Sequence, residues 1–347
     1  MKSIVLCGGG TAGHVIPALA LLPKLKRHFG TIAYIGEKGG IEEKLAREKG
    51  LPFHLVTCAK LKRSLSPSNL KIPFLLVKGV RDARKALEKL RPAAVFSKGG
   101  YVALPVVLAA YSLKIPVVAH ESDLTPGVSN RISSRFCRCV CASFEECAGR
   151  FKNGVYTGSP VREELKKGVR RRFSGFDENK PNLLIMGGSS GARFLNDILR
   201  QCLGQLLARY NVIHLAGAGN LISHAAPNYL QIEFLEDVAD IYASADLVVC
   251  RAGANTLLEM LALQKPMLLI PLPKSGSSRG DQQQNAAYFA GRGYALMADQ
   301  RELGREEFIK KIEHLQKAAG TLRENMKKAR LKDGNTEVVK QILKYSL

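Results

Sequence analysis

The stretch LCGGGTAGHVIPAL (residues 6–19) follows a short apolar run and precedes a helical pattern. Its glycines let the backbone approach a ligand closely. The first amide groups of the following helix would face the same loop, which favours phosphate or another anion there. The spacing Gly8-x-Gly10-x-x-Gly13 also satisfies the dinucleotide-binding fingerprint. The stretch therefore predicts a strand, a glycine loop and a helix, with His14 as an unusual residue directly after the last glycine.

The same order recurs in NLLIMGGSSGARFLNDIL (182–199), and short apolar runs alternate with helical patterns after each copy. This alternation is typical of doubly wound parallel sheets. We expect an α/β protein of two Rossmann-like doubly wound parallel-sheet domains, residues 1–160 and 161–327, facing across a cleft. The expected strands outside the two glycine-loop stretches are TIAYIG (31–36), FHLVT (53–57), AAVFSKG (93–99), PVVAH (116–120), CRCVCAS (137–143), VIHLAG (212–217), LQIEFLE (230–236), LVVCRAG (247–253) and MLLIPL (267–272).

The turn-rich segment NGVYTGSPVREELKKG (153–168) is the expected hinge between the domains. A basic helix at about residues 328–347 carries an apolar stripe, and we expect it to return to the first domain. The stripe consists of Val338, Val339, Ile342 and Leu343.

The chain is strongly basic, with 52 Lys and Arg against 30 Asp and Glu among 347 residues, a formal net charge of +22. Such a charge favours nucleic acid, an anionic membrane surface or phosphorylated substrates. The chain has no RNA-module aromatic signature and no zinc-finger spacing, which disfavours nucleic acid.

The eight cysteines of the chain do not suggest a disulfide framework. Cys137, Cys139 and Cys141, with Cys147 as a fourth ligand, allow a metal site, but period-two spacing favours three buried thiols on one strand face.

The longest apolar stretch, VALPVVLAAYSLKIPVVA (102–119), is interrupted by Pro105, Lys114 and Pro116. It predicts a helix and then a buried strand rather than a membrane span, and we expect no signal peptide.

The segment at residues 60–91 mixes many basic residues with an apolar group, which predicts peripheral docking on an anionic membrane. The alternative is a core helix with a solvated basic face. The apolar group comprises Ile72, Phe74, Leu75, Leu76 and Val77.

Several loops, spread over nearly the whole chain, together resemble those of one family. They are GGTAGHVIPALAL (9–21), SKGGYVALPVVLAA (97–110), PVVAHESDLTPGVSNR (116–131), YTGSPVRE (156–163), MGGSSGARFLN (186–196), DLVVCRAGANTLLE (246–259) and RGDQQQNA (279–286). With these loops the chain resembles the peptidoglycan N-acetylglucosaminyltransferases, two-domain GT28-type enzymes with the GT-B glycosyltransferase fold.

The resemblance implies inverting transfer of N-acetylglucosamine from UDP-N-acetylglucosamine to the C4 hydroxyl of the muramyl sugar of lipid I, undecaprenyl-pyrophosphoryl-MurNAc-pentapeptide. The products are lipid II and UDP. It implies a peripheral enzyme at the cytoplasmic face of the cell membrane, bound to the anionic inner surface, without nucleic acid. It also allows protein partners from cell-wall synthesis or cell division. Because the chain has no Asp-x-Asp metal motif, we expect neither a metal nor a cofactor.

The resemblance also assigns roles to residues. His14 is the candidate base, His120 and Glu121 are further catalytic candidates, and Gly99, Gly100 and Tyr101 would line the acceptor side. The residues implied to bind UDP-N-acetylglucosamine are Thr11, Ala12, Gly13, Arg162, Ser189, Leu235, Arg251, Ala254, Asn255, Thr256, Glu259, Gln282 and Gln283. The acceptor loop reads HESD where part of the family has an amide pair after His-Glu, so no role is carried over to Asp123.

Four alternatives stay open from the residues. The first is another GT-B transferase that makes a glycolipid from a UDP-sugar, and the second is a binding module for a nucleotide sugar or nucleic acid. The third is a dehydrogenase that would use the first glycine loop with Glu37 at the ribose. Lastly, His14 could be a first-turn residue that only hydrogen-bonds its loop. The loops HES (120–122) and GGY (99–101) favour the transferase, and a second glycine loop is unexplained by the dehydrogenase.

Overall fold

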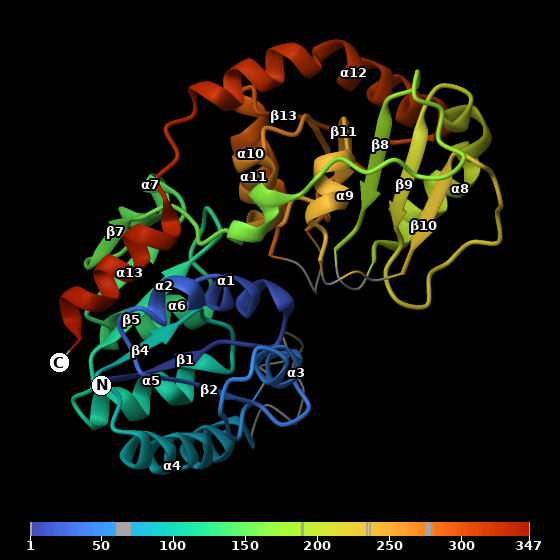
Figure 1. Cartoon of the computed structure of the whole chain (residues 1–347). Helices are drawn as coiled ribbons and strands as arrows, with labels where there is room; N and C mark the ends of the chain where they lie inside the picture. The colour runs from blue at the N-terminus through green and yellow to red at the C-terminus, as the bar shows by residue number, and fades with distance from the viewer. Residues whose placement is uncertain are drawn as a thin grey trace. The chain divides into compact units, whose positions relative to one another are not determined.

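The computed structural model describes residues 2–59, 71–188, 191–233, 235, 237–274 and 279–346. It divides into two compact units (Figure 1). Unit 1 comprises Met1–Arg162 together with Leu331–Leu347, and unit 2 comprises Glu163–Arg330.

The described residues of unit 1 form a seven-stranded sheet in the order β3-β2-β1-β4-β5-β6-β7, and every pair of neighbours is parallel. Its core strands are almost wholly apolar because both faces of the sheet are covered. The strands are β1 (Ser3–Cys7), β2 (Thr31–Gly36), β3 (Phe53–Leu55), β4 (Ala94–Ser97), β5 (Val117–Glu121), β6 (Cys139–Ala142) and β7 (Gly154–Tyr156).

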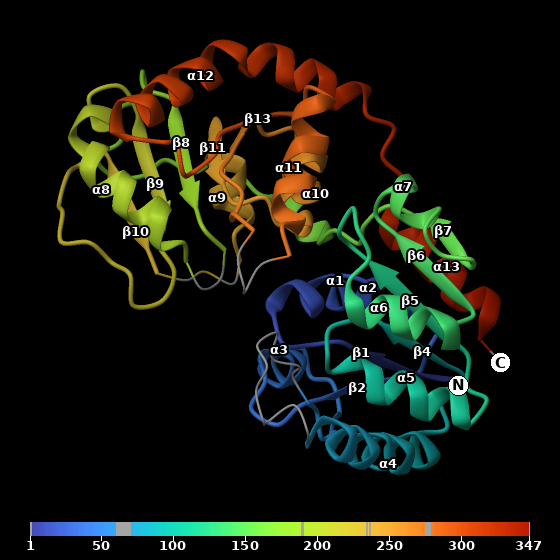
Figure 2. The ribbon, with the colours of Figure 1, turned by 180° about the vertical axis from the view of Figure 1, so that it is seen from behind.

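The helices of unit 1 cover its sheet on both faces, as Figures 1 and 2 show. One face packs against α1, α2, α3 and the C-terminal helix α13, whose Val338, Val339 and Ile342 are buried in that core. The other face packs against α4 and α5. The helices are η1 (Ala12–His14), α1 (Ile16–Leu19), α2 (Leu22–Leu25), α3 (Ile41–Glu48), α4 (Ile72–Leu90), α5 (Ala103–Ser112), α6 (Val128–Ser133), η3 (Ser134–Phe136), α7 (Glu145–Ala148) and α13 (Gly334–Tyr345).

In the described part of unit 2, six parallel strands follow the order β10-β9-β8-β11-β12-β13. They are β8 (Asn182–Met186), β9 (Asn211–Leu215), β10 (Tyr229–Ile232), β11 (Leu247–Cys250), β12 (Met267–Leu269) and β13 (Ala295–Met297). Helices α8 and α12 pack against each other, and α12 also contacts β11 and β12. The helices are η4 (Glu163–Lys167), α8 (Arg193–Leu207), α9 (Ala239–Ser244), α10 (Ala254–Ala262), α11 (Asp281–Gly291) and α12 (Arg305–Lys328).

These two sheets confirm the predicted fold class of Rossmann-like, doubly wound parallel sheets. The predicted strands are present, and the structure adds β7 and β13, which had not been predicted. In each unit the strand order reverses between two central neighbours, β1 and β4 in unit 1 and β8 and β11 in unit 2. Ligands of open α/β sheets bind outside the carboxyl ends of the strands at such a switch point.

The cysteines of β6 are only partly as expected. Cys139 and Cys141 are buried on the sheet face that α13 covers, whereas Cys137 packs against the core on the opposite face. The prediction that all three share one face is wrong for Cys137, because β6 begins only at Cys139 and the two-residue period does not extend before it. Within the described residues, no group of three or more His, Cys, Asp and Glu side chains is placed to hold a metal ion.

The apolar stretch at residues 102–119 forms α5 and then the buried strand β5, which confirms the predicted helix and strand. In the part of the chain that the structure describes, every helix is too short or too polar to cross a membrane. Residues 60–70 of the predicted membrane-docking segment lie outside the described residues, and the remainder forms α4.

Candidate active site

The glycine loop after β1 is held in place by a buried carboxylate from α3. Glu42 is fully buried, and its Oε2 accepts a 3.2 Å hydrogen bond from the backbone amide of Gly10, while Oε1 accepts one of 3.2 Å from that of Glu37. A Cβ on Gly9 would lie 2.4 Å from the Glu42 carboxylate. Gly9 therefore allows the carboxylate to reach under the loop. Glu42 was not predicted, although a Glu in the first turn of a helix after two glycines is a visible signal.

The loop after β4 meets the glycine loop at the switch point. Gly99 and Gly100 have φ values of +86° and +79°, which only glycine adopts readily. A Cβ on Gly100 would lie 2.4 Å from the carbonyl oxygen of Gly9. The two loops thus pack backbone against backbone, and the predicted acceptor residues Gly99 and Gly100 lie beside the predicted donor loop.

Tyr101 completes this part of the site. A Cβ on Gly10 would lie 2.5 Å from the Tyr101 ring, and the Tyr101 phenol donates a 2.6 Å hydrogen bond to Oε2 of Glu37. Burial, with the bond to Glu37 adding to it, raises the pKa of Tyr101 well above its ordinary value. The phenol therefore remains a hydrogen-bond donor at neutral pH. Glu37, which the dehydrogenase alternative would place at a ribose, has a carboxylate engaged with Tyr101.

His14 ends the short helix η1, and its Nδ1 lies 2.9 Å from the hydroxyl oxygen of Thr11. In the tautomer with the proton on Nδ1, the Thr11 oxygen accepts that proton and the lone pair of the ring is on Nε2. Thr11 is exposed, and Ala12, Gly13 and His14 are partly exposed. The structure thus brings four of the predicted residues together on one accessible loop.

His120 lies at the end of β5 and is fully buried. Its Nε2 lies 3.1 Å from the carbonyl oxygen of Gly158, so Nε2 carries a proton and donates to it. Burial and the nearby Lys98 ammonium hold the pKa of His120 well below its ordinary value. His120 is therefore neutral at physiological pH and joins β5 to the chain after β7.

Glu121 is buried beside His120 and shapes the loop at residues 121–127. Its Oε1 accepts a hydrogen bond from the amide of Asp123 (3.1 Å), and its Oε2 accepts from the amide of Gly127 (2.8 Å) and from Nδ2 of Asn130 (3.0 Å). These contacts give Glu121 a positioning role in the loop.

Lys98 lies in a predicted loop of the site but was not itself predicted as a site residue. Only 1% of Lys98 is exposed, and its ammonium donates a 2.5 Å hydrogen bond to Oγ of Ser122. Burial lowers the pKa of Lys98 to about 8, against the opposing influence of Glu121 and Asp123. A lysine directly before two glycines at a strand end was the available signal.

In unit 2, Arg251 directly follows β11. Its Nη1 donates to the carbonyl oxygen of Ile270 (2.9 Å) and to Oε1 of Gln300 (2.7 Å), and the guanidinium lies 5.9 Å from the centre of the Phe194 ring. Burial lowers the pKa of Arg251, and two acceptors satisfy part of its donor set. Arg251 therefore fixes the carboxyl ends of β11 and β12 relative to each other.

Helix α10 begins directly after Gly253, so that its first amide groups point toward the carboxyl edge of the sheet. Ala254 is buried, Asn255 and Thr256 are partly exposed in its first turn, and Glu259 follows on the same helix and is buried. The glycine loop after β8, the neighbour of β11, has positive φ at Gly188 and Gly191. A helix start beside a glycine loop is a favourable place for a diphosphate.

Gln282 and Gln283 lie in the first turn of α11 and face the loop after β12. Oε1 of Gln282 accepts from the amide of Leu272 (2.9 Å), and Oε1 of Gln283 accepts from that of Lys274 (3.3 Å). These bonds orient both side-chain amides along the same loop.

Three further residues, Leu235, Arg162 and Ser189, were predicted to bind the donor. Leu235 is 37% exposed after β10, and Arg162 is the last residue of the first segment of unit 1. Ser189 lies outside the described residues.

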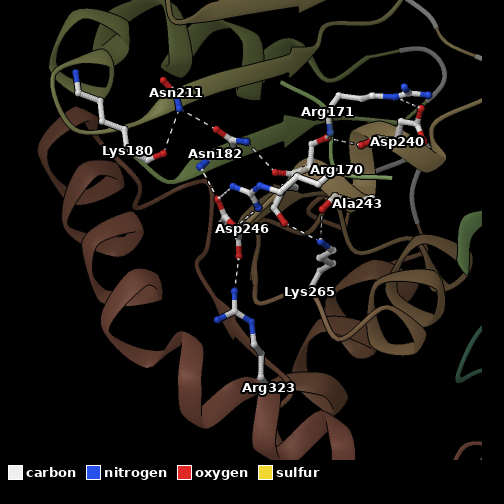
Figure 3. Close-up of polar contacts among 12 residues, drawn as sticks. Arg170, Arg171, Lys180, Asn182, Asn211, Asp240, Ala243, Asp246, Lys265 and Arg323 are labelled. Atoms are coloured by element: carbon white, nitrogen blue, oxygen red, sulfur yellow. Dashed lines mark hydrogen bonds and ion pairs between the residues drawn. The ribbon is translucent and has the colours of Figure 1, made fainter. Parts of the chain in front are cut away.

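The opposite, amino-terminal edge of the unit 2 sheet is held by a charged network around Asp246, which precedes β11 (Figure 3). Its carboxylate accepts two hydrogen bonds from Arg170, at 2.7 and 2.9 Å, and one of 2.9 Å from the amide of Asn182. Nζ of Lys265 donates to the carbonyl oxygens of Ala243 (3.0 Å) and Ala245 (2.8 Å). The network fastens the starts of β8 and β11, whose other ends carry the candidate site.

Comparison with known proteins assigns both halves of the chain to one family. Residues 4–142 match the glycosyltransferase family 28 N-terminal domain, and residues 182–342 match the glycosyltransferase family 28 C-terminal domain.

Similar curated proteins match this chain over nearly the full length of both sequences. A protein from Clostridium kluyveri is 44% identical over 99% of this chain and 100% of its own length, and one from Clostridium tetani is 42% identical over 99% and 98%. Both are named UDP-N-acetylglucosamine--N-acetylmuramyl-(pentapeptide) pyrophosphoryl-undecaprenol N-acetylglucosamine transferase. The crystal structure of Acinetobacter baumannii MurG is 27% identical and superimposes with a TM-score of 0.76, covering 99% of this chain and 100% of that one.

Proposed function

The chain belongs to glycosyltransferase family 28, and on this premise we propose that it transfers N-acetylglucosamine from UDP-N-acetylglucosamine to lipid I. The acceptor is the C4 hydroxyl of the muramyl sugar of undecaprenyl-pyrophosphoryl-MurNAc-pentapeptide, and the products are lipid II and UDP. The observation that carries this function is the full-length similarity, at 42–44% identity, to relatives named for this transfer.

The transfer is a single displacement with inversion at the anomeric carbon. The acceptor oxygen forms a bond to that carbon, the bond to the diphosphate of UDP breaks, and a base takes the acceptor proton. Three tasks follow: proton removal, stabilisation of the leaving diphosphate and alignment of both substrates. The candidate site offers groups for each of these tasks.

We assign the donor to the carboxyl edge of unit 2. The start of α10, with Asn255 and Thr256 in its first turn, would receive the diphosphate, since unpaired amide groups and the helix dipole favour negative charge. Glu259 would bind the ribose hydroxyls, and Gln282 and Gln283 would bind the sugar hydroxyls. Arg251 would contribute indirectly, by holding the ends of β11 and β12 in place.

We assign the acceptor to unit 1, with His14 as base. The partly exposed imidazole beside Thr11 supports this assignment, because a hydroxyl that accepts from Nδ1–H leaves the ring lone pair on Nε2. Tyr101 and the loop at residues 121–127 would line the acceptor side. His120 and Glu121 are buried and engaged with backbone groups, which supports positioning rather than proton transfer.

We also propose that unit 1 docks on the anionic inner surface of the cell membrane, at the cytoplasmic face. Phe74 and Val77 on α4 are 79% and 52% exposed, and Lys71, Lys78 and Arg81 are exposed around them. Exposed apolar side chains among basic ones favour a surface of anionic lipid. On the nearby α5 and α6, Tyr111, Val128 and Ile132 are also exposed.

The function is tested by following UDP release from UDP-N-acetylglucosamine with a soluble short-chain lipid I analogue in EDTA. We expect release that requires the acceptor and that falls at least ~10²-fold in His14→Ala. His28→Ala is the matched control, because His28 is an exposed histidine of the same unit outside the site. Release that survives His14→Ala would remove His14 as base while keeping the transferase. Release without any need for the acceptor would instead support another UDP-sugar enzyme.

A further inference from the structure

Lys98 has a buried ammonium group that the proposed transfer does not yet use. Its backbone amide donates to the carbonyl oxygen of Cys7 (2.8 Å), and its Cβ would lie 3.0 Å from a Cβ on Gly8. At its far end, Nζ donates to Oγ of Ser122 at 2.5 Å. Lys98 therefore contacts the start of the glycine loop through its backbone and stem, and the loop at residues 121–127 through its charge.

The cost of burying this ammonium points to a role beyond packing. A buried charge is destabilising relative to a well-packed apolar side chain of similar volume. The neighbouring Glu121 accepts three hydrogen bonds, and their donors are Asp123, Gly127 and Asn130 rather than Lys98. The Lys98 ammonium donates its hydrogen bond to Ser122, inside the loop.

We propose that Lys98 is a positioning residue that holds the loop at residues 121–127 in the shape that receives the acceptor. The proposal rests on the proposed function, which places the acceptor at this loop. Lys98 acts through Ser122 rather than on the reacting atoms, so its loss is expected to weaken acceptor binding more than it slows the bound complex.

The charged groups that face Lys98 predict how this role depends on pH. Glu121 and Asp123 favour its charged form, and His120 beside it is neutral because burial and Lys98 lower its pKa. Burial lowers the pKa of Lys98 to about 8. As the pH rises through this value the ammonium is lost, and with it the attraction to the two carboxylates. The KM for the acceptor is therefore expected to rise above about pH 8.

Stability is expected to change in the opposite direction. The folded pKa of Lys98, about 8, is below the unfolded value of about 10.4, so the unfolded chain binds more protons between these values. The contribution of Lys98 to the free energy of unfolding therefore increases with pH in that range. If the wild-type protein binds the acceptor more weakly above about pH 8 but is equally or more stable there, the weaker binding reflects loss of loop positioning rather than partial unfolding.

The experiment compares Lys98→Met, which keeps the stem and removes the charge, with Lys98→Arg, Ser122→Ala and the double variant Lys98→Met/Ser122→Ala. Lys265→Met is the matched control, since burial also lowers the pKa of Lys265 to about 8. The partners of Lys265 are the carbonyls of Ala243 and Ala245, at the amino-terminal edge of the unit 2 sheet. Steady-state kinetics with UDP-N-acetylglucosamine and the soluble lipid I analogue are measured from about pH 7 to about pH 9.5, which spans the titration.

In Lys98→Met we expect an acceptor KM about tenfold higher at pH 7, no rise with pH, and an unchanged KM for UDP-N-acetylglucosamine. Lys98→Arg should retain most acceptor binding, the double variant should be no worse than Lys98→Met alone, and Lys265→Met should leave the acceptor KM unchanged. A lower kcat with unchanged acceptor KM, or the same change in Lys265→Met, would overturn the proposal.

Hydrogen–deuterium exchange separates this inference from the proposed function. If the wild-type protein shows no transfer, the proposed function fails, and exchange at residues 121–127 still tests Lys98. Faster exchange of that loop in Lys98→Met, with the rest of unit 1 unchanged, would support the positioning role. Unchanged exchange of the loop would contradict it.

Discussion

The phenol of Tyr101 donates a 2.6 Å hydrogen bond to Oε2 of Glu37, which joins the loop after β4 to the loop after β2. Glu37 in turn donates its backbone amide to the buried Glu42, which also holds Gly10. Three loops of unit 1 thus share one set of hydrogen bonds at the carboxyl edge of the sheet. A rigid edge of this kind would hold the acceptor side of the proposed site in place.

Removal of the Tyr101 hydroxyl tests that connection. In Tyr101→Phe the ring still packs on Gly10, but the bond to Glu37 is lost, which should lower the free energy of unfolding by about 1–2 kcal/mol. Acceptor kcat/KM should fall several-fold, measured by UDP release. Tyr111→Phe is the control, because Tyr111 is 58% exposed, and it should change neither quantity. An unaltered Tyr101→Phe enzyme would show that the bond is dispensable.

Gly100 provides a test of the backbone contact at the switch point. A Cβ there would lie 2.4 Å from the carbonyl oxygen of Gly9, in addition to the strain of φ +79°. Gly39 has a similar φ of +71° but open space around its Cβ position. We expect Gly39→Ala to cost about 1–2 kcal/mol and Gly100→Ala more than about 3 kcal/mol, with loss of transfer. Denaturant unfolding of both variants measures this difference, and equal losses would mean that strain alone matters.

Much of the fold was predictable because both sheets are parallel and buried, so their strands form short apolar runs between helical patterns. The two glycine loops marked the first strand of each sheet. Strands β7 and β13 were not predicted, since each has only three residues at a sheet edge and is no longer than an ordinary loop segment. Cys137 illustrates a further limit, because a two-residue period does not reveal where the strand begins.

The candidate site was predictable in its loops but not in the side chains that support them. His14, Gly100 and Tyr101 follow strand ends, and their positions could be inferred from the sequence. Glu42 and Lys98 are charged residues that become buried only through contacts distant in sequence, namely Gly10 with Glu42 and Ser122 with Lys98. Residue type alone indicates a solvated side chain for both.

Asp246 is expected to stabilise unit 2 in a pH-dependent way. Burial raises its pKa, but hydrogen bonds from Arg170 and Asn182 together outweigh burial and hold the pKa below its ordinary value. Because the folded value is below the unfolded one, this contribution is fully present above about pH 4 and is lost as the pH falls through the folded pKa. Asp246→Asn should therefore lower the free energy of unfolding by about 1–3 kcal/mol at pH 7, with a smaller difference from wild type below about pH 4.

Asp299→Asn is the control for that prediction. Asp299 also pairs with an arginine, Arg301, whose hydrogen bonds hold its pKa at about 2, but the pair is local and exposed on the loop after β13. Solvent screening makes such pairs weak, so little change in stability is expected. Unfolding curves at pH 7 and at about pH 3.5 measure both variants. An Asp246→Asn protein as stable as wild type at pH 7 would show that the network in Figure 3 is not stabilising.

The exposed apolar side chains of α4 are expected to be needed for binding to anionic vesicles. Phe74 and Val77 are one turn apart, so they form one apolar patch that can enter the interface while neighbouring lysines and arginines meet lipid phosphates. Phe74→Ser/Val77→Ser should weaken co-sedimentation with phosphatidylglycerol vesicles at least about tenfold, from the loss of two buried apolar side chains. Val169→Ser, which removes an apolar side chain that is 58% exposed on unit 2, is the control. If the α4 variant binds vesicles as well as wild type, the membrane-binding surface lies in another part of the chain. If the variant loses vesicle binding but still releases UDP with the soluble analogue, docking is separate from catalysis.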